Sequence, residues 1–298
     1  MVKWRRGHRS EQVIDRRGAP GGGRLSIPGG RLSLPVLLVL MVLGVCFGGD
    51  ILGGGSGAID LGPILEQLAP APGGAAQGEA PLPPEADPDA ELAGFMSFVL
   101  DDVQASWADM FRQAGREYPP AELVLFSGST QSACGGATSA IGPHYCPLDE
   151  RVYLDLDFFR ELRRRFGAPG DFAQAYVLAH EIGHHVQNVT GIMDQVQQAQ
   201  QGDPDRANDL SIRLELPADC FAGVWAYTTF ERDLLDSGDL EEGIKAAEAV
   251  GDDRIQEQAT GMVDPETWTH GSSDQRARWF RAGFDAGPNA CDTFSGEV

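Results

Sequence analysis

Apolar residues recur every three or four positions along much of the C-terminal two thirds of the chain. This is the spacing of helices that bury one face. It predicts helices over residues 93–114, 158–166, 172–189, 209–230, 240–250 and 273–284. Asp171 is the predicted N-cap of the third helix, and Pro217 predicts an interruption in the fourth.

Two short apolar runs, Leu123–Phe126 and Val152–Leu156, have the composition of strands instead. A few short strands among many helices indicate an α+β fold. The sequence therefore predicts a mostly helical domain with a small sheet.

The first 90 residues differ in character from this domain. Residues 50–90 contain 15 Gly or Pro and show no sustained apolar periodicity. Such a composition is typical of a flexible linker. We therefore expect the compact domain to cover residues 91–298.

An uncharged apolar run of 16 residues occupies positions 34–49, and the stretch before it carries eight basic and two acidic side chains. This pattern favours a single membrane-anchor helix with the basic arm, residues 1–33, in the cytoplasm and the domain outside the cell membrane. The alternatives are a cleaved signal peptide, a lipoprotein attached through Cys46, and a buried core helix.

The net charge of the whole chain is −21, although its N-terminal arm is basic. The body that follows is therefore even more acidic than the total. A strongly acidic surface repels phosphate groups, so the charge argues against nucleic acid as a partner.

Four cysteines, Cys134, Cys146, Cys220 and Cys291, lie in the expected extracytoplasmic domain. Four cysteines allow three pairings. Bonding of Cys134 to Cys146 would close a local loop, and Cys220 would then tie to Cys291. A Cys/His metal site and unpaired buried cysteines are the alternatives, but no C-x-x-C spacing supports a metal site.

The segment His180-Glu181-Ile182-Gly183-His184 lies within a predicted helix. Histidines four residues apart project from the same helix face, so two imidazoles can reach one Zn²⁺. Glu181 sits beside the first histidine and can act on a water without binding the metal. His185 points roughly 100° away from His184 and is not expected to be a ligand.

A catalytic zinc site has three protein ligands and one open position. No third histidine follows at a suitable spacing, because Thr190 stands six residues after His184. Glu215 and Asp219 lie four apart in another apolar predicted helix. Glu215 is the candidate third ligand, and Asp219 is the candidate acceptor for the second N–H of a ligating histidine.

The chain resembles the bacterial putative neutral zinc metallopeptidase family (YpfJ-like), in the thermolysin-like arrangement. The resemblance covers about residues 95–290 and is carried by Tyr176 to Asn188, Arg213 to Cys220, Ala133-Cys134-Gly135, Gly142 to Pro147 and His270 to Arg276. It implies a membrane-anchored or exported peptidase. It also implies that His270, or Arg276, stabilises an oxyanion. The family commonly has Gln where this chain has Pro217.

These residues together predict a peptidase that holds one Zn²⁺ per chain through His180, His184 and Glu215, with Glu181 as general base and a peptide or protein as substrate. Zinc hydrolysis of a non-peptide amide or ester is a second enzymatic interpretation. A non-catalytic zinc-stabilised binding or scaffold protein of the cell envelope is the alternative from another class.

Overall fold

The structure is a computed structural model that describes residues 1–18, 87–166, 170–296 and 298. The apolar run 34–49 and nearly all of the predicted linker lie outside these residues. Among the described helices, none combines the length and the apolar character required to span a bilayer.

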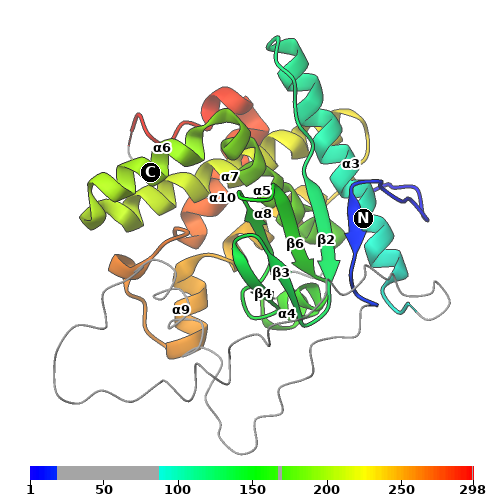
Figure 1. The fold of residues 1–298 in the computed structure, drawn as a ribbon, viewed down its shortest axis with the longest axis horizontal. Helices are drawn as coiled ribbons and strands as arrows, with labels where there is room; N and C mark the ends of the chain where they lie inside the picture. Colours follow the sequence, from blue (N-terminus) through cyan, green and yellow to red (C-terminus); the bar gives the residue numbers. More distant parts are fainter. Residues whose placement is uncertain (19–86, 167–169, 297) are drawn as a thin grey trace, which may run out of the picture.

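The described chain is mostly helical with small sheets, which confirms the α+β class (Figure 1). The strands are β1 (Val13–Asp15), β2 (Glu122–Phe126), β3 (Ser129–Ser132), β4 (Gly135–Thr138), β5 (His144–Cys146) and β6 (Arg151–Asp155). The longer helices are α3 (Ala90–Gln113), α4 (Asp157–Phe166), α5 (Asp171–Thr190), α6 (Ile192–Gly202), α7 (Ala207–Glu231), α8 (Asp239–Ala249), α9 (Asp252–Thr260) and α10 (Ser273–Ala286).

The larger sheet has four strands in the order β1-β2-β6-β5, and its two central strands, β2 and β6, are buried on both faces. β1, β2 and β6 run parallel, and β5 pairs antiparallel with β6. Alternate residues of β2 face opposite ways, so Leu123 and Leu125 join the main core whereas Val124 and Phe126 join a smaller cluster on the other face. Burial on both faces explains why β2 reads as a continuous apolar run.

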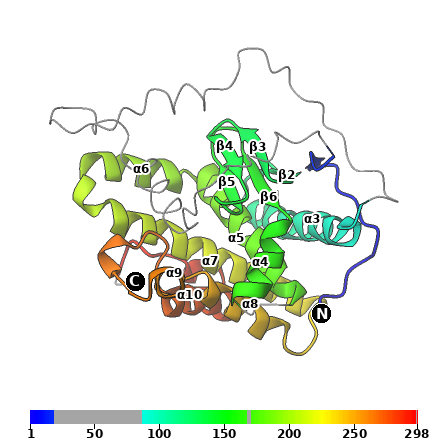
Figure 2. The same cartoon turned by 90° about the horizontal axis from the view of Figure 1, so that it is seen from below.

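Helix α5 lies at the centre of the molecule, between the sheet and α7, α8 and α10 (Figure 2). It packs against α3, α7 and α8 and also touches β5 and β6. Sixteen of its 20 residues are buried. Polar side chains on such a helix are removed from water and require internal partners.

The two predicted strands and six predicted helices are all present, with boundaries shifted by a few residues. The sequence did not reveal the short polar strands β3 and β4 or the strands β1 and β5. It also did not reveal α6 and α9. The predicted N-cap was wrong: Gly170 occupies the cap of α5, and Asp171 is its first helical residue.

The predicted interruption at Pro217 was also wrong, because α7 continues through that residue. A proline has no N–H to donate to the carbonyl four residues earlier, which is that of Arg213. Thr293 from the C-terminal segment provides a replacement, since its hydroxyl donates to the Arg213 oxygen at 2.5 Å. Thr293 is only 1% exposed. A side-chain hydrogen bond from elsewhere in the chain thus lets the helix continue.

Helices α5 and α7 approach each other closely at Gly183. A Cβ atom added there would lie 2.9 Å from the Ala218 carbonyl oxygen and 3.0 Å from the Ala218 Cα. This backbone contact requires glycine. It accounts for a residue that is otherwise unfavourable within a helix.

Both expected disulfides are formed. Cys134 bonds to Cys146 and ties the β3-β4 hairpin to β5, and Cys220 bonds to Cys291 and ties α7 to the C-terminal segment. The second bond lies two residues from Thr293 and helps to hold it beside α7.

The basic composition had suggested a separate arm over residues 1–33. Residues 1–18 are instead packed against the rest of the described chain. Val2 is 4% exposed and belongs to the main hydrophobic core. Val13 to Asp15 form β1, which lies beside β2 in Figure 1. The compact body therefore includes both residues 1–18 and the chain from residue 87 onward.

We expect Thr293→Val to lower the free energy of unfolding by about 1–3 kcal/mol, because the Arg213 carbonyl would lose its donor and Thr293 itself is buried. Chemical denaturation measures the change. Pro217→Ala restores an N–H that can donate to Arg213, so in that background Thr293→Val should cost clearly less. Equal losses in both backgrounds would contradict the assigned hydrogen bond.

Candidate metal centre

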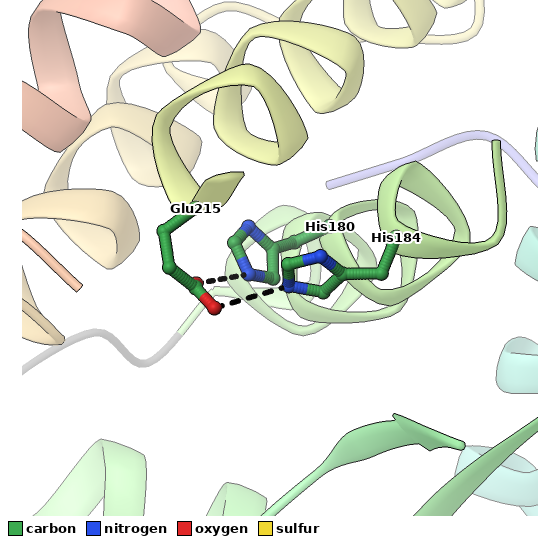
Figure 3. Close-up of side chains that lie close together, drawn as sticks. All are labelled: His180, His184 and Glu215. Atoms are coloured by element: carbon green, nitrogen blue, oxygen red, sulfur yellow. Dashed lines mark ion pairs between the residues drawn. The ribbon is translucent and has the colours of Figure 1, made fainter. Parts of the chain in front are cut away.

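His180 and His184 lie one turn apart on α5 and point the same way, as the spacing predicted (Figure 3). Both are buried, at 6% and 9% exposure. Their ring centroids are 4.8 Å apart and the rings are nearly perpendicular. The Nε2 atom of each ring faces the carboxylate of Glu215 (Figure 3).

Glu215 comes from α7 and completes a group of three. Its oxygens lie 3.2 Å from His180 Nε2 and 3.4 Å from His184 Nε2. One ligand atom from each of the three residues lies within 4.8 Å of the others. The predicted metal ligands are therefore brought together although 31 positions separate His184 from Glu215.

The donor set fits zinc. Atoms that bind one tetrahedral zinc at about 2.0–2.2 Å lie roughly 3.3–3.6 Å from each other, which is close to the separations seen here. Two imidazoles and one carboxylate are also the ligands of thermolysin-type catalytic sites, which leave one position for water. The residues present can hold the metal that the sequence predicted.

Asp219 fixes the orientation of His180. Its Oδ1 lies 2.8 Å from His180 Nδ1, and a carboxylate only accepts, so Nδ1–H is the donor and Nε2 remains for the metal. Tyr176 and Arg276 also donate to Asp219. The carboxylate is fully buried with these three partners, and it accepts from His180, one of the two histidines that the sequence predicted as ligands.

The neighbouring charges shift the pKa values of His180 and Glu215. Burial alone would lower the pKa of His180, but Asp219 outweighs it and raises that pKa to about 10. Burial would raise the pKa of Glu215, yet the neighbouring His184 and His180 hold it well below its usual range. The centre thus favours positive charge, and binding of a cation there would displace a proton from His180.

Gln187, one turn after His184, orients the second of the two clustered histidines and was not predicted. Its Oε1 lies 2.8 Å from His184 Nδ1, and its Nε2 donates to the Leu214 carbonyl at 2.5 Å. A carbonyl can only accept, which fixes the amide so that its oxygen faces His184. That ring must then donate from Nδ1 and keeps Nε2 for the metal.

The Gln187 amide also connects the two helices of the centre, because Leu214 directly precedes Glu215. It is 0% exposed. The available sequence signal was a glutamine three residues after a predicted ligand on the same helix, which is within reach of its ring.

Glu181 follows His180 on α5 and is 7% exposed. It is not one of the three clustered residues. Its role as general base stays a prediction.

His270 lies in the loop before α10 and is held by Asp252. Its Nδ1 is 3.1 Å from Asp252 Oδ1, and its backbone N–H donates to the same carboxylate. Its charge contributes to lowering the pKa of Glu215, after the larger contributions of His184 and His180. Burial acts to lower the pKa of His270, but Asp252 and Glu215 raise it above its usual value.

Three further residues lie near this region or in the segments that carry the family resemblance, and none belongs to the metal cluster. Arg276 pairs with Asp219, behind His180, and is 4% exposed. His185 bonds to Tyr145 and to the Pro119 carbonyl and is not in the metal cluster, so it is a core histidine. His144 stacks on Tyr153 in the sheet and is not a member of the metal cluster.

Comparison with known proteins gives one family and several relatives. The family profile described as "Putative neutral zinc metallopeptidase" matches residues 2–294. The chain is 41% identical over 304 residues to "Uncharacterized protein YpfJ" of Escherichia coli (strain K12), covering 100% of both chains. It is 46% identical over 207 residues to "Uncharacterized protein Mb2605" of Mycobacterium bovis, covering 65% of this chain and 68% of the other. No solved structure matches this chain.

We expect Gln187→Leu to weaken zinc binding about 10–100-fold, because His184 would lose the acceptor that fixes its tautomer. Competition with a chromophoric chelator measures the affinity. Gln195→Leu, the same change at an exposed position of α6, is the matched control. Equal zinc affinity in the two variants would show that Gln187 does not support the centre.

Proposed function

Because this chain belongs to the putative neutral zinc metallopeptidase family, we propose that it is a zinc-dependent peptidase whose metal is held by His180, His184 and Glu215. The observation that carries the proposal is the cluster of these three donors, with both histidines held so that Nε2 is free. A purely structural zinc is usually closed by four protein ligands. Three ligands with Glu181 beside them favour catalysis over a scaffold role.

Bound zinc would polarise the substrate carbonyl and lower the pKa of a water molecule in the site. Glu181 takes the proton from that water as its oxygen attacks the peptide carbonyl. The same carboxyl then gives the proton to the leaving amine, which completes hydrolysis. Asp219 and Gln187 keep the two imidazoles aligned throughout.

His270 is the proposed donor to the oxyanion that develops on the substrate. Asp252 accepts from Nδ1–H of its ring. Asp252 and Glu215 also raise the pKa of His270 against the effect of burial, which favours the imidazolium form, in which Nε2 carries a proton as well and can donate it. The half-exposed side chain can reach a substrate, whereas Arg276 is buried against Asp219. This contrast favours His270 over Arg276 for the role.

We also propose that the catalytic body works outside the cytoplasm, on peptide or protein substrates. Two disulfides within one domain support an oxidising compartment. The apolar run 34–49 remains the candidate attachment to the cell membrane.

Glu181→Gln should bind one zinc per chain and lose about 10²–10⁴-fold in kcat/KM, because the amide cannot accept the proton of the attacking water. The full chain with oxidised cysteines is assayed for metal content and for cleavage of an unfolded protein. Full activity in the variant would remove Glu181 from the mechanism. One zinc with no cleavage in the wild type would favour the scaffold alternative, and absence of zinc would refute the metal centre.

His270→Ala should lower kcat about 10²–10³-fold while the zinc content stays at that of the wild type, because an oxyanion donor acts on the transition state and not on the metal. Steady-state kinetics and metal analysis of the same preparation give both values. A loss of zinc, or an unchanged kcat, would contradict this role.

A further inference from the structure

The N-terminal segment, residues 1–18, is built into the catalytic body through buried contacts. Val2 donates its backbone N–H to Asp171 at 2.9 Å, and the N–H of Lys3 donates to the Leu234 carbonyl at 2.8 Å. The Trp4 ring packs against two phenylalanines of α3, with the nearer centroid 5.4 Å away. Asp171, the first residue of the helix α5 that carries His180 and His184, is thus a direct partner of this segment.

The same segment provides the outer strand of the sheet. Val13 to Asp15 pair in parallel register with Leu123 to Leu125 of β2. The pairing is extended by hydrogen bonds from Leu123 N to the Gln12 carbonyl and from Arg16 N to the Leu125 carbonyl. Without β1, these backbone groups of the apolar strand β2 would lose their partners.

Arg17 closes the segment with a buried ion pair. It is 9% exposed, and its guanidinium lies 2.7 Å from Asp15 and 2.8 Å from Asp87, at the point where the described chain resumes before α3. A buried guanidinium is stable only with such partners. The segment is therefore anchored at both ends.

The basic residues of this segment also have partners on the acidic body. Lys3 lies 3.2 Å from Asp233, and Arg6 lies 3.2 Å from Glu91. From the sequence pattern, we expected these positive charges to keep the N-terminal arm in the cytoplasm. In the structure, the same positive charges form ion pairs with carboxylates of the acidic domain.

We propose that residues 1–18 and the catalytic body lie on the same side of the membrane. A chain that crossed the bilayer once between residues 18 and 87 would separate β1 from β2 by a hydrocarbon layer of about 30 Å. The strand pairing, the Val2 contact and the Arg17 ion pair all exclude that separation. The single-pass topology expected from the basic arm is therefore replaced by one in which both parts share a compartment.

Cysteine accessibility in cells tests this directly and does not depend on peptidase activity. In the full chain with Cys46→Ser, single cysteines are introduced by Arg9→Cys in the N-terminal segment and Lys245→Cys on α8. Both positions are exposed basic residues outside the metal centre. Spheroplasts, whose cytoplasmic membrane is intact, are treated with a membrane-impermeant maleimide. Permeabilised cells and the Cys46→Ser parent are the controls.

Labelling of both cysteines in spheroplasts, or protection of both until permeabilisation, supports the shared compartment. Labelling of one with protection of the other overturns it. The first result also supports the extracytoplasmic location proposed above. The second would contradict that location while leaving the shared compartment intact, so the two proposals fail separately.

A stability measurement on the same full chain tests the docking itself. Val2→Asp puts an unpaired charge into the core and should lower the thermal midpoint, whereas Arg5→Asp, at an exposed neighbouring position, should leave it nearly unchanged. Equal midpoints for both variants would show that the segment is not part of the folded body and would overturn the proposal.

Discussion

The close crossing of α5 and α7 is the constraint on which the rest of the structure depends. Gly183 lets the two backbones touch at Ala218, and this contact brings Glu215 to both histidines and Asp219 to His180. A larger residue at Gly183 would push the two backbones apart and draw Glu215 away from the two histidines. The glycine that is least favourable for an isolated helix is therefore the one that the metal centre requires.

Polar groups on both sides of this crossing are satisfied by residues from distant parts of the chain. Pro217 removes a backbone donor from α7, and Thr293 supplies a substitute to Arg213. The Gln187 side-chain N–H donates to the next carbonyl, that of Leu214, and the amide oxygen of the same side chain accepts from His184 and orients its ring. The backbone around the proline and the tautomers of the ligands are thus settled by the same few hydrogen bonds.

The N-terminal segment shows how a charge pattern can have two physical explanations. Basic residues before an apolar run commonly mark a cytoplasmic end, and that was the expectation from the sequence. The same residues also complement an acidic body, and Lys3, Arg6 and Arg17 pair with carboxylates on it. Only the fold distinguishes the two, because the partners lie far away along the chain.

The sequence by itself determined the features that depend on local spacing. Helical periodicity predicted the main helices, and the i, i+4 arrangement placed His180 with His184 and Glu215 with Asp219 on common faces. Which faces meet is not a local property. The tertiary structure alone decided the crossing at Gly183, the selection of Gln187 and Thr293 as partners, the continuity of α7 and the addition of β1 to the sheet. Each depends on contacts between residues distant in the chain, and a local pattern carries no information about such contacts.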